Sequence, residues 1–136
     1  MAVINRFQDL QVWNLARTLE NRVFEITQLG KLSNDFSLRN QLNKSTGSVM
    51  DNIAEGFGRS GRTEFIQFLS ISKGSVTELQ SQLYRCFDRG YISDSVLNEL
   101  LELCNKTIGK LVNLMKYLNN SYVKGEKFLG RDNHLK

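Results

Sequence analysis

The 136-residue sequence contains no proline and only one histidine, His134. Average usage of about 5% would place roughly seven prolines in such a chain. Proline breaks helices and the central strands of sheets, so its absence favours long helices joined by short turns. The two cysteines, Cys86 and Cys104, have no neighbouring cysteine or histidine at metal-ligand spacing. We expect both to be reduced core residues rather than a disulfide.

The sequence also lacks a long hydrophobic run. No apolar stretch approaches the ~20 residues that span a bilayer, and residues 1–9 lack the apolar core of a signal peptide. We therefore expect a cytoplasmic protein without membrane contact. The 18 Lys and Arg residues against 14 Asp and Glu give a net charge of +4. This mild excess permits a polyanionic partner but does not require one.

Apolar residues recur at helical spacing over most of the chain, and no segment alternates as a strand would. The pattern predicts helices over residues 9–29, 37–57, 63–89 and 93–119. The first helix is expected to bury one face, formed by Leu10, Trp13, Ala16, Val23 and Phe24. Four helices with short turns predict an all-α, antiparallel up-down-up-down four-helix bundle over residues 1–119. Residues 120–136 have no such period, and we expect a basic, frayed tail there.

Several residues mark helix ends or contacts. Ser93 is a good N-cap for the last helix, and Gly90 is placed as a C-cap glycine. Gly74 falls in the middle of the third helix, where glycine lowers helix stability. We interpret Gly74 as a place where another helix approaches closely.

The segment Asp51–Phe65, "DNIAEGFGRSGRTEF", raises a separate question because Gly56, Gly58 and Gly61 have the spacing G-x-G-x-x-G. A dinucleotide-binding turn with this spacing needs a strand before it and a parallel sheet around it. A helix precedes it here, so a nucleotide site is not expected. The simpler interpretation is a turn between two helices. In it, Gly56 and Gly58 take positive φ, and Ser60 or Thr63 caps the next helix.

Arg59 and Arg62 fit this turn less well, because positive charge is unfavourable near a helix N-terminus. Two interpretations of these arginines fit the sequence equally well. The arginines and free backbone N–H groups form an anion site, or Glu55 and Glu64 neutralise the arginines.

Residues that could support catalysis are sparse. His134 and Arg131 lie in the expected tail, so no histidine is available in the body for a ribonuclease-type site or a catalytic triad. Asp51 and Glu55 are at helical spacing and could share a metal ion, but solvent or arginine contacts fit them better. We expect no enzymatic activity, no cofactor and no small-molecule substrate.

Several segments together resemble a known family. "NIAEGFGR", "EFIQFLSISKGSVTELQSQL" and "GYIS", with the opening "FQDLQVW", resemble the four-helix-bundle 23S rRNA intervening-sequence proteins over about residues 7–118. The chain departs from that family's pattern in its first turn, "LSNDFS", which lacks a proline. It also has Lys44-Ser45 where an arginine-alanine pair is typical.

The resemblance implies a small cytoplasmic helical protein without established enzymatic activity. It further implies a ring-shaped homo-oligomer, most simply a pentamer. A related protein, the accessory protein of diversity-generating retroelements, binds a reverse transcriptase and nucleic acid.

Two functions are compatible with the residues and the resemblance. The first is an oligomeric protein that binds RNA or a nucleoprotein through a basic surface. Its candidate contacts are Arg59, Arg62, Lys73, Arg85 and Arg89, with Tyr84 and Tyr91 as candidate stacking residues. The alternative is a protein–protein scaffold or an accessory subunit, for example of a reverse transcriptase, without its own RNA binding.

Self-association has its own candidate residues. The last helix has one apolar stripe that runs from Leu97 to Leu118 and a second stripe beside it. Together they make an apolar face wider than one neighbouring helix needs, and this surplus predicts a subunit interface. The second stripe consists of Val96, Leu100, Leu103 and Leu114.

Overall fold

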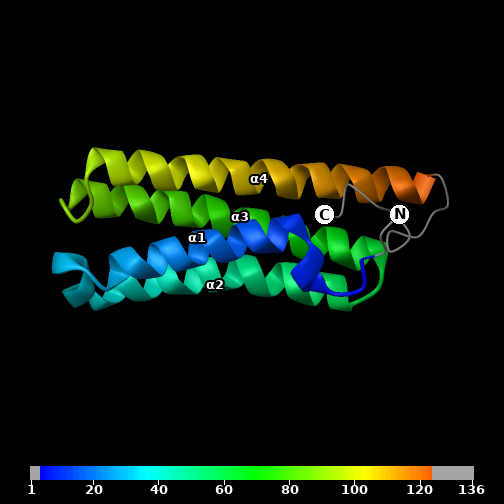
Figure 1. Ribbon diagram of the computed structural model, residues 1–136, viewed down its shortest axis with the longest axis horizontal. Helices are drawn as coiled ribbons and strands as arrows, with labels where there is room; N and C mark the ends of the chain where they lie inside the picture. The colour runs from blue at the N-terminus through cyan, green and yellow to red at the C-terminus, as the bar shows by residue number, and fades with distance from the viewer. Residues whose placement is uncertain (1–3, 124–136) are drawn as a thin grey trace.

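The computed structural model describes residues 4–123, which form a bundle of four α-helices (Figure 1). The helices are α1 (Gln11–Thr27), α2 (Phe36–Gly58), α3 (Arg62–Asp88) and α4 (Asp94–Val123). Two 3-10 turns precede α1 and α2, at Phe7–Asp9 and Gly30–Asn34. The predicted all-α four-helix bundle is confirmed. The last helix extends to Val123, past its predicted end, and residues 124–136 of the predicted tail lie outside the described part.

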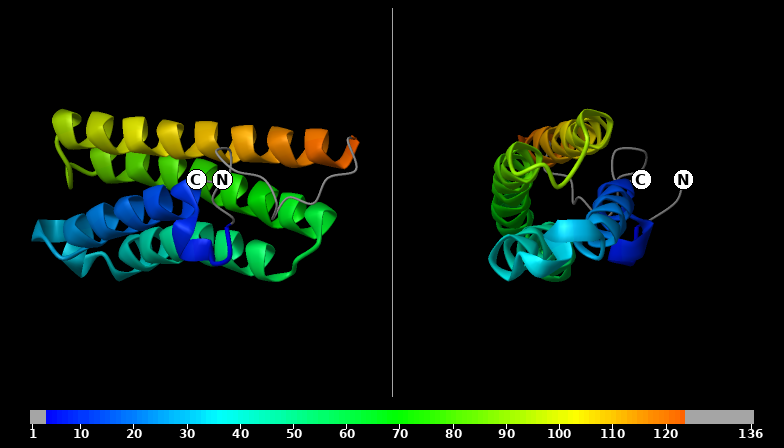
Figure 2. Two further views of the ribbon diagram at one scale, coloured as in Figure 1. Left: turned by 45° about the vertical axis from the view of Figure 1, so that its right-hand side comes forward. Right: turned by 90° about the vertical axis from the view of Figure 1, so that its left-hand side faces the viewer.

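The helices run alternately up and down, so each contacts its neighbours along the chain and α1 also contacts α4. In Figure 1, α1 and α2 form one layer and α3 and α4 the other, and the end-on view in Figure 2 shows the four around a common axis. An ion pair joins the first helix to the last: Arg22 donates to the carboxylate of Glu99 at 2.8 and 2.9 Å. This pair lowers the pKa of Glu99 through its hydrogen bonds from Arg22.

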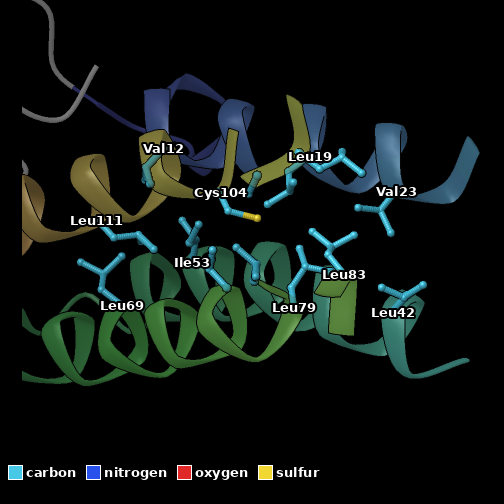
Figure 3. Packing of buried hydrophobic residues seen from close by; sticks show 14 of the residues in the cluster. Val12, Leu19, Val23, Leu42, Ile53, Leu69, Leu79, Leu83, Cys104 and Leu111 are labelled. Carbon is cyan, nitrogen blue, oxygen red and sulfur yellow. The ribbon is translucent and has the colours of Figure 1, made fainter. Parts of the chain in front are cut away.

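All four helices contribute to the core (Figure 3). Leu19, Ile53, Leu79 and Leu100 are buried, one from each helix in turn. Cys86 and Cys104 are buried and unpaired, as predicted. The expectation for Phe24 is wrong, because its ring is exposed on the surface of α1.

The contact between α2 and α3 is lined by small polar side chains. The Ser72 hydroxyl donates to the backbone oxygen of Val49 at 3.0 Å, and the hydroxyls of Ser48 and Ser75 are 2.9 Å apart. Such short side chains let two helix backbones approach closely while leaving few polar groups unsatisfied. Gly74 is not part of this contact. An added Cβ there would meet nothing within 4 Å, so the predicted close approach at Gly74 is wrong.

Two predicted helix ends are confirmed. Ser93 Oγ accepts from the backbone N–H of Val96 at 3.1 Å, the N-cap bond expected for α4. Gly90 has φ 75° and follows the end of α3. The next N–H, of Tyr91, donates to the Cys86 oxygen at 2.9 Å, which satisfies one of the terminal carbonyls of the helix.

The turn between α2 and α3 differs from its prediction. Gly56 and Gly58 both lie inside α2, and among residues 4–123 the only non-glycine residue with positive φ is Ser60, at 63°. Gly61, not Ser60 or Thr63, occupies the N-cap position of α3, without a side-chain cap bond. Gly56 instead leaves the space that Phe68 of α3 needs to pack against α2. An added Cβ would lie 2.6 Å from Cβ of Phe68.

Candidate nucleic-acid interface

Arg59, at the α2–α3 turn, has partners within the chain. Its guanidinium donates to Glu55 at 2.7 Å, lies 3.9 Å from the Glu64 carboxylate, and is 5.3 Å from the centre of the Phe68 ring. The hydrogen bond to Glu55 raises the pKa of Arg59 above its ordinary value. Arg59 is therefore paired with Glu55 and Glu64, the two partners that the second interpretation names. The side chain nevertheless stays about half exposed, at 49%.

Arg62 and Lys73 lie on the same flank of α3. Arg62 is the first residue of the helix and is half-buried, and Lys73 follows about three turns later and is exposed. About two turns beyond Lys73, Gln80 donates to Asn105 of α4 at 2.9 Å. The flank that carries Arg62 and Lys73 is therefore the one that faces α4.

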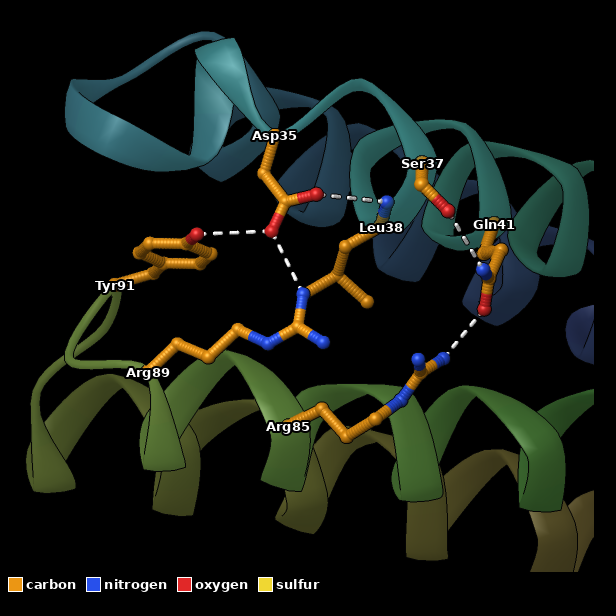
Figure 4. Close-up of polar contacts among 7 residues, drawn as sticks. All are labelled: Asp35, Ser37, Leu38, Gln41, Arg85, Arg89 and Tyr91. Atoms are coloured by element: carbon orange, nitrogen blue, oxygen red, sulfur yellow. Dashed lines mark hydrogen bonds and ion pairs between the residues drawn. The ribbon is translucent and has the colours of Figure 1, made fainter.

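Arg89 and Tyr91 converge on Asp35 at the other end of α3 (Figure 4). Arg89 donates to Oδ2 of Asp35 at 2.7 Å, and the Tyr91 hydroxyl donates to the same oxygen at 2.8 Å. Oδ1 of Asp35 accepts from the backbone N–H of Leu38 at 3.3 Å, which caps α2. These bonds, Tyr91 first, lower the pKa of Asp35, and the Asp35 bond raises the pKa of Tyr91. Sequence reasoning missed this cluster, although an aspartate three residues before Leu38 is an N-cap signal.

Arg85 also points to α2. Its guanidinium donates to Oε1 of Gln41, and Gln41 in turn donates to the Ser37 hydroxyl at 3.2 Å (Figure 4). Arg85 follows Lys73 by about 120° of helical rotation, and it therefore lies on a different flank.

The five candidate basic residues thus do not share one surface. Arg59, Arg62 and Lys73 belong to the turn and the α4-facing flank, whereas Arg85 and Arg89 belong to the α2-facing flank near the far end. The 27 residues of α3 span about 40 Å. Of the candidate stacking residues, Tyr84 is exposed, while the Tyr91 hydroxyl is bonded to Asp35.

The four residues of the predicted interface stripe on α4 also differ in their burial. Leu100 and Leu114 are buried in the core of the single chain, whereas Val96 and Leu103 are half-buried and pack against that core. The assumption that the bundle cannot cover both stripes is therefore corrected for Leu100 and Leu114. Sequence reasoning missed the apolar side chains that are exposed, Phe24, Leu29 and Phe36 among them.

The structure gives no grouping typical of a metal centre in the part of the chain it describes. Asp51 and Glu55 are exposed, and the Glu55 carboxylate accepts from Arg59. Over residues 4–123, no three His, Cys, Asp or Glu side chains are placed to hold one ion. No stretch of the described helices combines the length and the hydropathy that a bilayer crossing requires. His134 and Arg131 lie outside the described residues.

Comparisons with known proteins agree with this fold. No curated protein matches the chain. A crystal structure from Bacteroides thetaiotaomicron VPI-5482, of a protein with unknown function from the S23 ribosomal protein family, is similar with a TM-score of 0.70 at 18% sequence identity. The match covers 77% of this chain and 98% of that one. The model of the 23S rRNA-intervening sequence protein family matches residues 8–113. The chain therefore belongs to the 23S rRNA-intervening sequence protein family.

Proposed function

We propose that this protein is a non-enzymatic, cytoplasmic adaptor that self-associates and binds the phosphate backbone of RNA. The main support for RNA binding is that Arg59, Arg62 and Lys73 lie along the turn and one flank of α3. The net charge of +4 favours a polyanionic ligand. Arg85 and Arg89 are left out of this surface because they lie on the α2-facing flank near the far end of α3, away from the turn.

The ion pairs of Arg59 do not prevent phosphate binding. Arg59 and its partners Glu55 and Glu64 are each about half exposed, and exposed ion pairs contribute little to stability. A phosphate can therefore replace Glu55 at small cost, and guanidinium groups bind phosphate oxygens in a bidentate fashion. Backbone contacts of this kind carry no direct sequence information.

Fluorescence anisotropy with single-stranded RNAs of unrelated sequence tests the proposal. We expect similar affinities for the different sequences and a fall in affinity as salt is raised. Each lost phosphate contact should flatten the slope of log affinity against log salt by about 0.7. The variant Arg62→Gln/Lys73→Gln should therefore flatten it by about 1.4 per subunit.

Lys106→Gln is the matched control, because Lys106 is an exposed lysine on α4 outside this surface. It should leave the slope nearly unchanged. Unmodified protein that binds no RNA in a salt-dependent way would refute RNA binding.

A second candidate function is a protein–protein scaffold without RNA binding. The exposed side chains of Phe24, Leu29 and Phe36 favour it, because large apolar groups gathered on a surface mark contact sites. A protein that self-associates but shows no salt-dependent RNA binding would support this scaffold. We propose five subunits for the assembly, on the resemblance, and light scattering measures that mass directly.

A further inference from the structure

Five large apolar side chains are exposed at the end of the bundle where α1 ends and α2 begins. They are Phe24 (49% exposed), Leu29 (64%), Phe36 (61%), Tyr84 (51%) and Phe87 (37%). The first three belong to α1, α2 and their connection, and the last two to the final turns of α3. They therefore form two groups, one on each layer of the bundle (Figure 1).

The first group, Phe24, Leu29 and Phe36, is called the α1–α2 patch. Phe24 lies two residues after Arg22, which contacts α4, so helical rotation of about 200° places Phe24 on the opposite flank of α1. Phe36 lies about 140° around α2 from Gln41, which contacts Arg85 of α3. Both rings are thus turned to the outer side shared by α1 and α2.

The charged groups around the α1–α2 patch are mostly positive. The guanidinium of Arg39 lies 4.8 Å from the centre of the Phe36 ring. The further exposed cations on this side of the bundle are Arg17, two turns before Phe24 on the same flank of α1, and Lys31, in the connection between α1 and α2. The acidic groups nearby are Glu20, which is half-buried, and Asp35, whose carboxylate is bonded to Arg89 and Tyr91. The patch is therefore apolar with a basic border.

The second group, Tyr84 and Phe87, is called the α3–α4 patch. Tyr84 follows Gln80 by about one helical turn and Phe87 by about two, and Gln80 contacts α4. The exposed charges near this patch are mostly negative: they are Asp88 at the end of α3 and Asp94 and Glu102 on α4, with Lys106 one turn further along α4. The arginines of this end, Arg85 and Arg89, are bonded to Gln41 and Asp35 on the other flank. The α3–α4 patch is therefore apolar with an acidic border.

We infer that the α1–α2 patch of one copy docks on the α3–α4 patch of the next copy. The two patches lie on opposite layers of the bundle and at the same end, and their borders are mostly of opposite charge. Complementary charge favours this pairing, and like charge disfavours either patch against itself. Such a head-to-tail contact joins copies into a closed ring or an open chain. The inference rests on the self-association in the proposed function and names its surfaces.

Two variants, each lacking one patch, test the pairing. One is Phe24→Ser/Phe36→Ser and the other is Tyr84→Ser/Phe87→Ser. All four side chains are exposed, so both variants should keep helical circular dichroism and a cooperative melt. We expect each variant alone to be a monomer by light scattering. Their equimolar mixture should form a dimer and nothing larger, because only one intact patch of each kind remains.

Ile71→Ser is the matched control, because Ile71 is 52% exposed but lies outside both patches. It should assemble as the unmodified protein does. A monomeric unmodified protein would overturn both self-association and this inference, leaving RNA binding to its own assay. An unmodified multimer whose two patch variants still assemble would overturn only the surfaces named here. A mixture that stays monomeric would overturn the head-to-tail pairing.

Discussion

The two ends of the α2–α3 pair are held together in different ways. At the turn end, Gly56 lets Phe65 and Phe68 approach α2 closely, and the rings of Phe57 and Phe65 meet edge to face with centroids 5.9 Å apart. At the far end, Asp35 binds Leu38, Arg89 and Tyr91 through hydrogen bonds. The stability of the turn end therefore depends on the volume of its packed side chains, and that of the far end depends on the charged carboxylate of Asp35. They should therefore respond to different perturbations.

The largest effect is expected from Phe65→Ala at the turn end. Phe65 is fully buried, and removing a buried phenylalanine leaves a cavity that typically costs about 3–5 kcal/mol. Urea denaturation measures the change. Ile71→Ala on the exposed side of the same helix should change stability by at most about 0.5 kcal/mol. Equal losses for both variants would show that the turn end is not held by packing.

Gly56→Ala should have the next largest effect. The new Cβ would lie 2.6 Å from Cβ of Phe68 and 3.1 Å from Cδ1 of Phe65. Overpacking costs about 1–3 kcal/mol, and the better helix propensity of alanine returns up to about 1 kcal/mol. Gly74→Ala is the matched control, because its Cβ meets nothing within 4 Å. That variant should be stabilised by about 0.4–1 kcal/mol. Stabilisation of both variants in urea would contradict the close approach at Gly56.

Asp35→Asn should destabilise the far end in a way that depends on pH. The pKa of Asp35 is lowered in the folded chain, so its contribution is complete above the unfolded value of about 3.9. That contribution is lost as pH falls through the folded pKa. Melting temperatures of the variant and the unmodified protein should differ at pH 7 and converge in strong acid. A difference that stays constant with pH would remove Asp35 as the cause.

The rate of thiol labelling shows whether Asp35→Asn destabilises only the far end of the bundle or the whole chain. Burial raises the pKa of Cys86 to about 11 and that of Cys104 to about 12, so neither should react at neutral pH until the chain opens. The Asp35 and Arg89 charges act on Cys86 at the far end. Asp35→Asn should therefore speed the labelling of Cys86 more than that of Cys104. Equal acceleration would indicate global unfolding.

The smallest effect is expected from Arg59→Gln at the turn end. Arg59 forms exposed ion pairs, which are screened by solvent and salt. Its melting curve should overlay that of the unmodified protein. A clear fall in the midpoint would show that the turn end also depends on charge, and the contrast between the two ends would be lost.

Local patterns were sufficient to predict the helices and several of their ends. The apolar period places four helices, and Ser93 and Gly90 act as the caps that their residue types favour. These features depend on neighbours a few residues away, so a sequence contains the information directly. The glycine-rich turn is different. Glycine serves either for positive φ or for close approach, and only the packing of Phe68 on Gly56 distinguishes them.

The candidate site was harder to predict because its partners are distant in the chain. Arg89 binds Asp35, 54 residues away, and Arg85 binds Gln41, 44 residues away. A list of basic residues cannot show which ones have carboxylate or amide partners. Phe24 shows the same limit for apolar residues, because its residue type favours the core but its ring lies on the surface of α1. Leu100 and Leu114 show the converse, because helices on both flanks of α4 cover them.

The serine contacts between α2 and α3 have a consequence for how the chain folds. The two helices are consecutive, and only residues 59–61 separate them, so their contacts close a short loop at little entropic cost. Contacts of α1 with α4 join the two ends of the chain and close a much longer loop. We expect the α2–α3 hairpin to form first, with the outer helices adding to it. Ser72→Ala should then slow refolding, whereas Leu19→Ala should mainly speed unfolding.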